Sequence, residues 1–315
     1  MSETFQPPPG HRPRRSLGQN FLVDRGVQAR IVEAVTRIPG GGILEIGPGK
    51  GALTEGLVAL GDPLVLVELD ADLALAHRER WASAPHVTVL ERDILSVDLA
   101  EVVPDPARLS VVGNIPYNIT TPILFHLLER PRPAEFLLMV QKEVADRLLA
   151  EPGTGGYGAL TVGVRTVARV ERVLNVPAGA FRPRPRVDSS VVRITPRRPE
   201  PLSPAEEAHL RVLTRALFQW RRKQLGKSLR DHPDLGLRRE AAEELLAELG
   251  FTPRTRPEEL GPEAFVALSR GVSEAMLETG PGTGPETGSE TGPEAGSETG
   301  PETEARRGRR GRRAR

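Results

Sequence analysis

The sequence predicts an α/β protein built on a parallel sheet, followed by a smaller helical domain. Two observations carry this prediction. From Ser203 to about residue 276 the pattern is helical, and Ser203, Pro204 and Glu206 form a capping-box sequence. Upstream, near-continuous apolar runs alternate with segments long enough for helices, which indicates a parallel sheet covered on both faces. The predicted strands are 42–46, 64–69, 87–90, 109–112 and 136–140.

Two helices have recognisable starts. Residues 24–38 follow a potential N-cap at Asp24 and carry one apolar stripe, made of Val27, Ile31, Ala34, Val35 and Ile38. Thr121 and Pro122 are expected to cap and begin another helix.

The sheet is expected to end in an antiparallel pair. Residues 157–176 and 187–195 are longer β-rich runs that can pair beyond the parallel strands. Residues 196–204 are rich in proline and resemble a linker to the helices. We therefore expect a catalytic domain over 12–198 and a helical domain over 199–277.

The two ends of the chain are expected to be disordered, at 1–11 and 278–315. The C-terminal segment repeats a Glu-Thr-Gly-Pro/Ser theme with too little apolar surface to offset the entropy of ordering. Its final Arg-Gly run carries seven arginines. By charge this run can contact RNA, but a solvated tail without a required role is the favoured interpretation.

Composition excludes several classes of function. The chain has no cysteine, which excludes disulfides, thiolate zinc sites and a cysteine nucleophile. No stretch resembles a signal peptide or reaches the roughly 18 apolar residues of a membrane span. We therefore expect a soluble, cytoplasmic protein that needs no metal. Basic residues gather at 12–15, 182–198, 211–230 and the C-terminus, which favours a polyanionic partner.

A glycine-rich turn follows the first predicted strand. In "EIGPGKGALT" (45–54), Gly47, Gly49 and Gly51 allow a tight turn and a close approach to a ligand. With Ala52 the stretch also satisfies the loose dinucleotide fingerprint, so a nicotinamide dehydrogenase is one alternative.

Four residues at strand ends recur at the spacing of β-α units. Gly47, Glu68, Asp93 and Asn114 are separated by 21, 25 and 21 residues. They should reach the carboxyl edge of the sheet, where open α/β folds bind ligands. Glu68 is placed to accept hydrogen bonds from ribose hydroxyls, and Asp93 to accept from an adenine amine.

The stretch "NIPY" (114–117) has the groups to hold an aromatic amine. Asn114 offers a side-chain carbonyl, and Ile115 offers a backbone carbonyl kept extended by Pro116. Two acceptors on the two N–H bonds of an adenine N6 would favour a pyramidal nitrogen with its lone pair turned toward a methyl donor. Tyr117 offers a face on which a flipped-out base can stack. The alternative is that the stretch is an Asn-X-Pro turn with a purely structural role.

Together with these motifs, other stretches resemble the KsgA/RsmA family of ribosomal RNA adenine dimethyltransferases over about residues 12–275. They are "GQNFL" (18–22), "NIPYNITTP" (114–122), "VQKEVADRL" (140–148), "YGALTV" (157–162) and "FRPRPRVDSSVVRI" (181–194). The resemblance implies a Rossmann-like class I S-adenosylmethionine-dependent methyltransferase. It also implies dimethylation of N6 on two adjacent adenosines near the 3′ end of small-subunit rRNA during ribosome assembly.

The resemblance also assigns roles to residues. It implies that Asn20, Leu22, Gly47, Gly49, Glu68, Asp93 and Asn114 bind S-adenosylmethionine. The catalytic clamp would comprise Asn114, Ile115, Pro116 and Tyr117, with Phe181 closing on the other face of the base. RNA would contact seven basic residues, which are Arg182, Arg184, Arg186, Arg221, Arg222, Lys223 and Lys227.

Two rival functions remain open besides the nicotinamide dehydrogenase. An erythromycin-resistance methyltransferase shares the donor motifs and "NIPY" but acts on large-subunit rRNA. A non-catalytic RNA-binding assembly factor would not need Glu68, Asp93, Asn114 and Tyr117 together. We expect the chain to act as a monomer on small-subunit rRNA or the assembling 30S particle.

Overall fold

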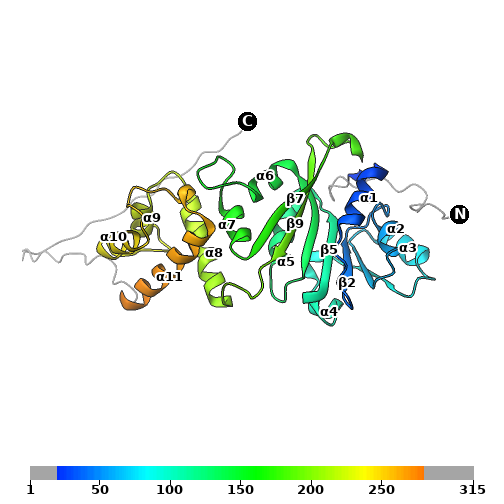
Figure 1. The fold of residues 1–315 in the computed structure, drawn as a ribbon, viewed down its shortest axis with the longest axis horizontal. Helices are drawn as coiled ribbons and strands as arrows, with labels where there is room; N and C mark the ends of the chain where they lie inside the picture. Colours follow the sequence, from blue (N-terminus) through cyan, green and yellow to red (C-terminus); the bar gives the residue numbers. More distant parts are fainter. Residues whose placement is uncertain (1–19, 280–315) are drawn as a thin grey trace, which may run out of the picture. The chain divides into compact units, whose positions relative to one another are not determined.

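The computed structural model describes residues 20–279. The segment expected to be disordered at 1–11 and residues 280–315 of the expected tail lie outside the described residues. The tail was expected to begin at residue 278, but residues 278 and 279 belong to the last helix. Within the described part, a seven-stranded sheet carries helices on its faces, and a group of helices follows it in the chain (Figure 1).

Five parallel strands confirm the predicted core of the sheet. They are β2 (Gly42–Ile46), β3 (Leu64–Glu68), β4 (Val87–Glu91), β5 (Leu109–Asn114) and β6 (Glu135–Gln141). Their spatial order is β4-β3-β2-β5-β6, and every neighbouring pair among them is parallel. The chain order reverses at β2, between β3 and β5, and such a switch point is where open α/β sheets bind ligands.

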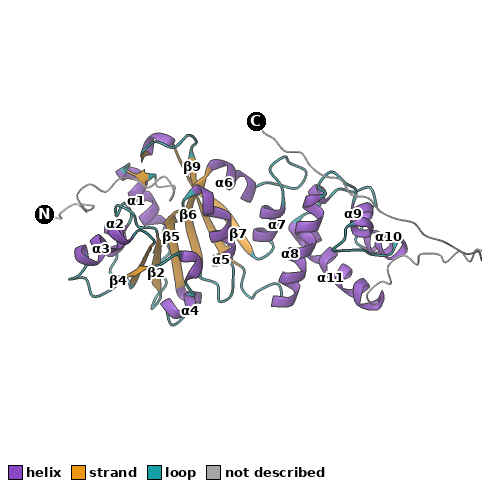
Figure 2. Ribbon diagram, turned by 180° about the vertical axis from the view of Figure 1, so that it is seen from behind, coloured by secondary structure: helices purple, strands orange, loops and turns teal. Residues whose placement is uncertain are grey.

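An antiparallel pair completes the sheet, as predicted. Strand β9 (Ser189–Pro196) pairs with β6, and β7 (Ala168–Val176) pairs with β9, both antiparallel. A separate two-stranded ribbon joins β1 (Phe21–Leu22) to β8 (Phe181–Arg182). Figure 2 shows the strands running side by side with helices packed along them.

Two apolar clusters lie on the two faces of the sheet. Successive strand residues point to opposite faces, so Ile43 and Leu44 belong to different clusters. The Ile43 cluster includes helices α1 (Arg25–Ala34) and α2 (Thr54–Val58). The Leu44 cluster includes α4 (Leu99–Val102), α5 (Thr120–Leu127) and two of the helices that follow the sheet, α8 (Pro204–Gln219) and α11 (Pro262–Thr279).

Two of the predicted helices have different boundaries in the structure. The N-cap at Asp24 is confirmed, because its carboxylate accepts from the Val27 N–H at 3.0 Å, but α1 ends at Ala34 rather than residue 38. The predicted cap at Thr121 is wrong. Helix α5 begins at Thr120, directly after a 3₁₀ turn, and the Thr120 hydroxyl bonds back to the Pro116 carbonyl at 3.3 Å.

The β-rich assignment of 157–176 is wrong for its first part. Residues Ala159–Arg165 form helix α7, which follows α6 (Lys142–Leu148). The Thr161 hydroxyl explains this local choice, because it accepts from the Gly158 N–H at 3.2 Å and donates to the Arg147 carbonyl at 2.7 Å. These bonds start a helix despite the β-branched composition.

The helical group comprises α8 (Pro204–Gln219), α9 (Leu225–Asp231), α10 (Arg239–Glu248) and α11 (Pro262–Thr279). The predicted capping box is confirmed by two bonds between Ser203 and Glu206, at 2.7 and 3.3 Å. Phe218 stacks on Phe265 with ring centroids 5.5 Å apart, which packs α8 against α11. None of the helices among residues 20–279 has the length and apolarity that crossing a bilayer requires.

Candidate active site

A pocket of about 250 Å³ opens at the carboxyl ends of β2, β3, β4 and β5. It brings together Gly47, Glu68, Asp93 and Asn114, although these residues lie on four different β-α units. The expected residues Asn20, Leu22, Gly49, Ile115, Pro116 and Tyr117 also line it. Of the residues expected at the donor site and the clamp, only Phe181 is missing from its lining.

The glycine turn after β2 forms one wall of the pocket. Gly47 and Gly49 adopt φ values of 62° and 55°, which favour glycine. A Cβ on Gly49 would also approach the Phe21 ring to 3.2 Å. The turn therefore depends on glycine both for its backbone conformation and for the close contact with the "GQNFL" segment.

Glu68 connects the turn to the end of β3. Its carboxylate accepts from the Gly49 and Asp70 N–H groups, each at 2.9 Å. Burial raises the pKa of Glu68 while these two bonds oppose the rise. A carboxylate has about four lone-pair sites, so each oxygen keeps capacity to accept from a ligand hydroxyl.

A second acidic group and two apolar side chains follow around the rim. One Asp93 oxygen accepts from the Leu95 N–H at 3.0 Å. Leu69 and Leu95 are large apolar side chains left 51% and 38% exposed, and both line the pocket. Exposed apolar side chains beside acceptor groups suit an aromatic base with polar edges.

Two buried titratable residues near the turn were not anticipated. Glu45 lies within β2, is 2% exposed and accepts from the Thr54 hydroxyl at 2.7 Å. Burial raises the pKa of Glu45 to about 8. The signal was visible as a single carboxylate inside the apolar run "GILEI".

His77 of α3 (Ala71–Arg80) supports the same turn. Its Nε2 lies 2.9 Å from the Gly49 carbonyl, and because a carbonyl only accepts, this nitrogen carries the proton. Burial lowers the pKa of His77 to about 4, so the ring is neutral at pH 7. The sequence held no clear signal for this contact, because His77 lies 28 residues from the glycine.

The amide of Asn114 has a defined orientation. Its Nδ2 donates to the Asn20 backbone carbonyl at 2.9 Å. Because the amide nitrogen must face that carbonyl, Oδ1 points the other way and keeps its lone pairs for another donor. Asn20 thus acts on the site through its backbone.

Tyr117 is held at its hydroxyl. The phenolic oxygen lies 2.7 Å from the Ser189 hydroxyl at the start of β9. Burial raises the pKa of Tyr117 above its usual value. The ring therefore stays neutral, and its phenol is tied to a strand that is distant in sequence.

Phe181 does not lie where the resemblance implied. Its side chain is fully buried, pairs through β8 with Leu22 of β1, and packs in the apolar cluster around Leu22, Ile31 and Ala180. In the described conformation the ring is not available to a base. The β1–β8 ribbon is the physical reason, since it turns the ring inward.

The expected RNA contacts fall into two groups. Arg182, Arg184, Arg186, Arg222, Lys223 and Lys227 are exposed. Arg221 differs, because its guanidinium forms an ion pair with Glu258 at 2.6 Å and bonds to the Thr154 and Gly155 carbonyls. Arg221 therefore joins the 154–155 loop to the helical group, and its charge is already engaged.

Comparison with known proteins agrees with this architecture. The family model described as "Ribosomal RNA adenine dimethylase" matches residues 10–245. "Ribosomal RNA small subunit methyltransferase A" of Pseudomonas aeruginosa is 43% identical over 277 residues, covering 87% of this chain and 98% of the relative. The protein of the same name from Acinetobacter baylyi is 42% identical over 261 residues, covering 82% and 92%.

Two solved structures have a similar fold. A dimethyladenosine transferase from Plasmodium falciparum has a TM-score of 0.68 and 25% identity, covering 82% of this chain and 97% of the other. The 23S rRNA methyltransferase ErmE has a TM-score of 0.62 and 30% identity, covering 81% and 100%.

Proposed function

This chain belongs to the ribosomal RNA adenine dimethylase family, and we propose that it dimethylates N6 of two adjacent adenosines near the 3′ end of small-subunit rRNA. It is an S-adenosylmethionine-dependent methyltransferase with a Rossmann-like class I fold, so the nicotinamide alternative is wrong. The relatives named for the small subunit share 42–43% identity with it, against 30% for the large-subunit enzyme ErmE. That difference favours the small-subunit target.

The pocket fits the methyl donor. The donor has a ribose, an adenine and a sulfonium-linked amino acid, and the pocket offers a carboxylate at Glu68, an acceptor at Asp93 and the exposed apolar side chains of Leu69 and Leu95. The glycine turn leaves open space where a Cβ on Gly47 would point. Glu68 would hold ribose hydroxyls, and Asp93 would hold the adenine amine. The donor, when bound, supplies an already activated methyl group.

The oriented amide of Asn114 is the observation that carries the proposal. Because Nδ2 is engaged by Asn20, Oδ1 is set to accept one N–H of the target adenine. We propose that the Ile115 backbone carbonyl accepts the other N–H. Two fixed acceptors favour a pyramidal N6 with its lone pair free to attack, and they are oriented before the substrate arrives.

Tyr117 would provide the surface for the flipped base. Its ring lines the pocket, and its hydroxyl is anchored at Ser189. Stacking of a base on an aromatic ring contributes about 1–3 kcal/mol. Closure by Phe181 stays a prediction that requires the β1–β8 ribbon to open.

Further parts of the proposal concern the rest of the chain. We propose that residues 12–198 are the catalytic domain, that 199–277 bind RNA, and that the protein acts as a cytoplasmic monomer on the assembling 30S particle. The exposed basic residues Arg182, Arg184, Arg186, Arg222, Lys223 and Lys227 would meet phosphates. Arg221 is excluded from that set because its guanidinium is engaged by Glu258.

Nucleoside mass spectrometry tests the proposal. Small-subunit and large-subunit rRNA from cells that lack the modification would be incubated separately with the protein and S-adenosylmethionine. N6,N6-dimethyladenosine in the small-subunit RNA is the expected result. Its appearance in large-subunit RNA alone would indicate the resistance-type activity. Its absence from both RNAs and from 30S particles would favour a non-catalytic assembly factor.

A further inference from the structure

A second cavity, of about 720 Å³, lies between α5, α7 and α8 and shares no lining residue with the donor pocket. We name it the α5–α7–α8 groove. It is defined by Phe125, Arg147, Leu160, Arg211, Arg215 and Phe218. Helix α5 separates the two cavities, because Ile123 lines the donor pocket whereas Phe125 lines the groove.

The floor of the groove is apolar and carries two aromatic rings. Phe125 and Phe218 are both partly exposed. Gly163 of α7 permits this arrangement, since a Cβ there would approach the Phe125 ring to 3.1 Å. Phe218 is held from behind by its stacking on Phe265. The rings are thus supported by the core and remain available on one side.

One face of α8 forms a wall of the groove. Arg211, Thr214, Arg215 and Phe218 recur at intervals of three and four residues, which places them on the same side of the helix. Thr214 is 4% exposed, and its hydroxyl makes no hydrogen bond to any described residue. A buried hydroxyl without a partner is uncommon in a native protein.

The rim of the groove has unbalanced positive charge. Arg147, Arg211 and Arg215 are exposed, and no ion pair joins any of the three to a carboxylate within residues 20–279. Glu129 also lines the groove, so three guanidinium groups are set against one carboxylate that has no arginine partner.

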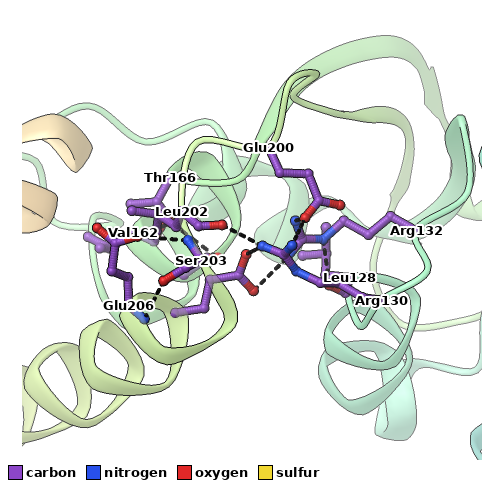
Figure 3. Close-up of polar contacts among 11 residues, drawn as sticks. Leu128, Arg130, Arg132, Val162, Thr166, Glu200, Leu202, Ser203 and Glu206 are labelled. Carbon is purple, nitrogen blue, oxygen red and sulfur yellow. Dashed lines mark hydrogen bonds and ion pairs between the residues drawn. The ribbon is translucent and has the colours of Figure 1, made fainter.

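The other acidic residue of the groove, Glu207, is already neutralised. Its carboxylate pairs with Arg130 at 2.7 Å and with Arg132 at 2.6 Å. Figure 3 shows Arg130 and Arg132 converging beside Glu200, which pairs with both of them. The lining as a whole therefore favours an anion with flat apolar parts.

We propose that the α5–α7–α8 groove binds a single-stranded stretch of the substrate RNA that flanks the methylated adenosine. Bases would pack against Phe125 and Phe218, and phosphates would meet Arg147, Arg211 and Arg215. Helix α5 begins at Thr120, three residues after Tyr117, so the groove adjoins the clamp through a single rigid element. This inference rests on the proposed function and extends it to the flanking nucleotides.

Replacement of the rim charges provides the test. Unmethylated small-subunit rRNA is the probe, and its dissociation constant is measured against salt for the full-length triple variant R147Q/R211Q/R215Q. Loss of three single-strand phosphate contacts should weaken binding about 100-fold at 0.1 M salt and flatten the log–log salt slope by about 2. The affinity for S-adenosylmethionine should not change, because these residues lie outside the donor pocket.

A charge-matched control separates the groove from general electrostatics. Arg169, Arg238 and Arg254 are exposed, line neither cavity and make no ion pair within the described part of the chain. The variant R169Q/R238Q/R254Q removes the same charge and should bind RNA within about threefold of the wild type. Equal weakening by both triple variants would overturn the groove as a specific site.

The aromatic floor is tested independently of charge. Phe125→Leu keeps the apolar packing and removes the flat ring, and it should weaken RNA binding about tenfold without changing the salt slope. Circular dichroism and the melting temperature establish that each variant is folded. RNA binding by folded R147Q/R211Q/R215Q at wild-type strength would overturn the inference.

Failure of the inference is distinguishable from failure of the proposed function. Methylation of small-subunit rRNA by the wild type, with unchanged RNA binding in the groove variants, would refute the groove alone. Weakened RNA binding in the groove variants, without any methylation by the wild type on RNA or particles, would refute the proposed activity and leave the groove as an RNA site.

Discussion

The Tyr117 hydroxyl lies 2.7 Å from the Ser189 hydroxyl, which joins the turn after β5 to the first residue of β9. Ser189 is fully buried and pairs with both β6 and β7 through its strand. The stretch "VDSSVV" (187–192) was expected to form a strand, and the structure also connects it to the candidate active site. It fixes the ring on which we propose that the target base stacks.

Removal of the Tyr117–Ser189 hydrogen bond should slow methylation without unfolding the protein. Ser189→Ala and Tyr117→Phe each delete one partner, and a hydrogen bond of about 1 kcal/mol corresponds to roughly a fivefold loss in kcat/KM. The double variant should be no slower than either single variant, because both act on the same bond. Losses that multiply in the double variant would show that the two hydroxyls act separately.

The buried carboxyl of Glu45 predicts a pH dependence of stability. Its pKa is raised to about 8 in the folded chain, against about 4.3 when unfolded. The folded state therefore holds a proton that the unfolded state releases, so this contribution to stability is present at acid pH and is lost as the pH rises from about 4.5 to 8. Glu45→Gln keeps an acceptor for Thr54 and removes the titration.

Urea unfolding of the wild type and Glu45→Gln at pH 5, 6.5 and 8 measures this effect. As the pH rises across this window, the variant should become more stable relative to the wild type by about 1 kcal/mol per pH unit. A difference that stays constant with pH would refute the raised pKa.

The Arg132–Glu207 ion pair should matter more for stability than the exposed pair that the neighbouring residue of α8, Glu206, makes with Arg270. Arg132 is 2% exposed, pairs with Glu200 (Figure 3) and donates to Glu207 at 2.6 Å. Arg132→Met leaves Glu200 and Glu207 with Arg130 as their remaining partner and removes the bond to the Leu128 carbonyl, and it should cost about 1.5–3 kcal/mol. Arg270→Gln breaks the exposed pair with Glu206 and should leave the urea midpoint nearly unchanged. Similar midpoints for the two variants in urea would contradict this ranking.

Arg221 and Arg222 are neighbours in sequence but should behave differently toward RNA. Arg222 is exposed, and Arg222→Gln should flatten the salt slope of RNA binding by about 0.7–1. Arg221 is engaged by Glu258, so Arg221→Gln should lower the melting temperature and leave the slope nearly unchanged. Equal changes of slope would place both side chains on the RNA.

Sequence reasoning predicted the sheet well because each strand is specified by the residues of that strand itself. Each apolar run specifies a strand, and the spacing from Gly47 to Asn114 already implied a common edge. It failed at Ala159–Arg165, where the hydroxyl of Thr161 bonds to Arg147 and favours a helix over the β propensity of the segment. That bond depends on α6, which the segment itself does not contain.

The candidate site was predictable only where its residues belong to local motifs. Motif residues at strand ends were found, whereas Glu45, His77 and Ser189 act through burial or through contacts made across the fold. Arg221 and Phe181 are the reverse case, because sequence reasoning assigned them to the site while their contacts in the structure point elsewhere. Their residue types suit RNA and base contacts, but tertiary partners engage one and bury the other.

The oriented amide of Asn114 is the central claim, and a single-turnover comparison tests it most directly. Wild type and Asn114→Ala, each saturated with S-adenosylmethionine, are mixed with unmethylated small-subunit rRNA, and N6-methylated adenosines are followed by nucleoside mass spectrometry. Loss of one of two fixed acceptors should remove about 3 kcal/mol of transition-state stabilisation, a fall of about 100-fold or more in rate. A folded Asn114→Ala variant that methylates at the wild-type rate would contradict the account.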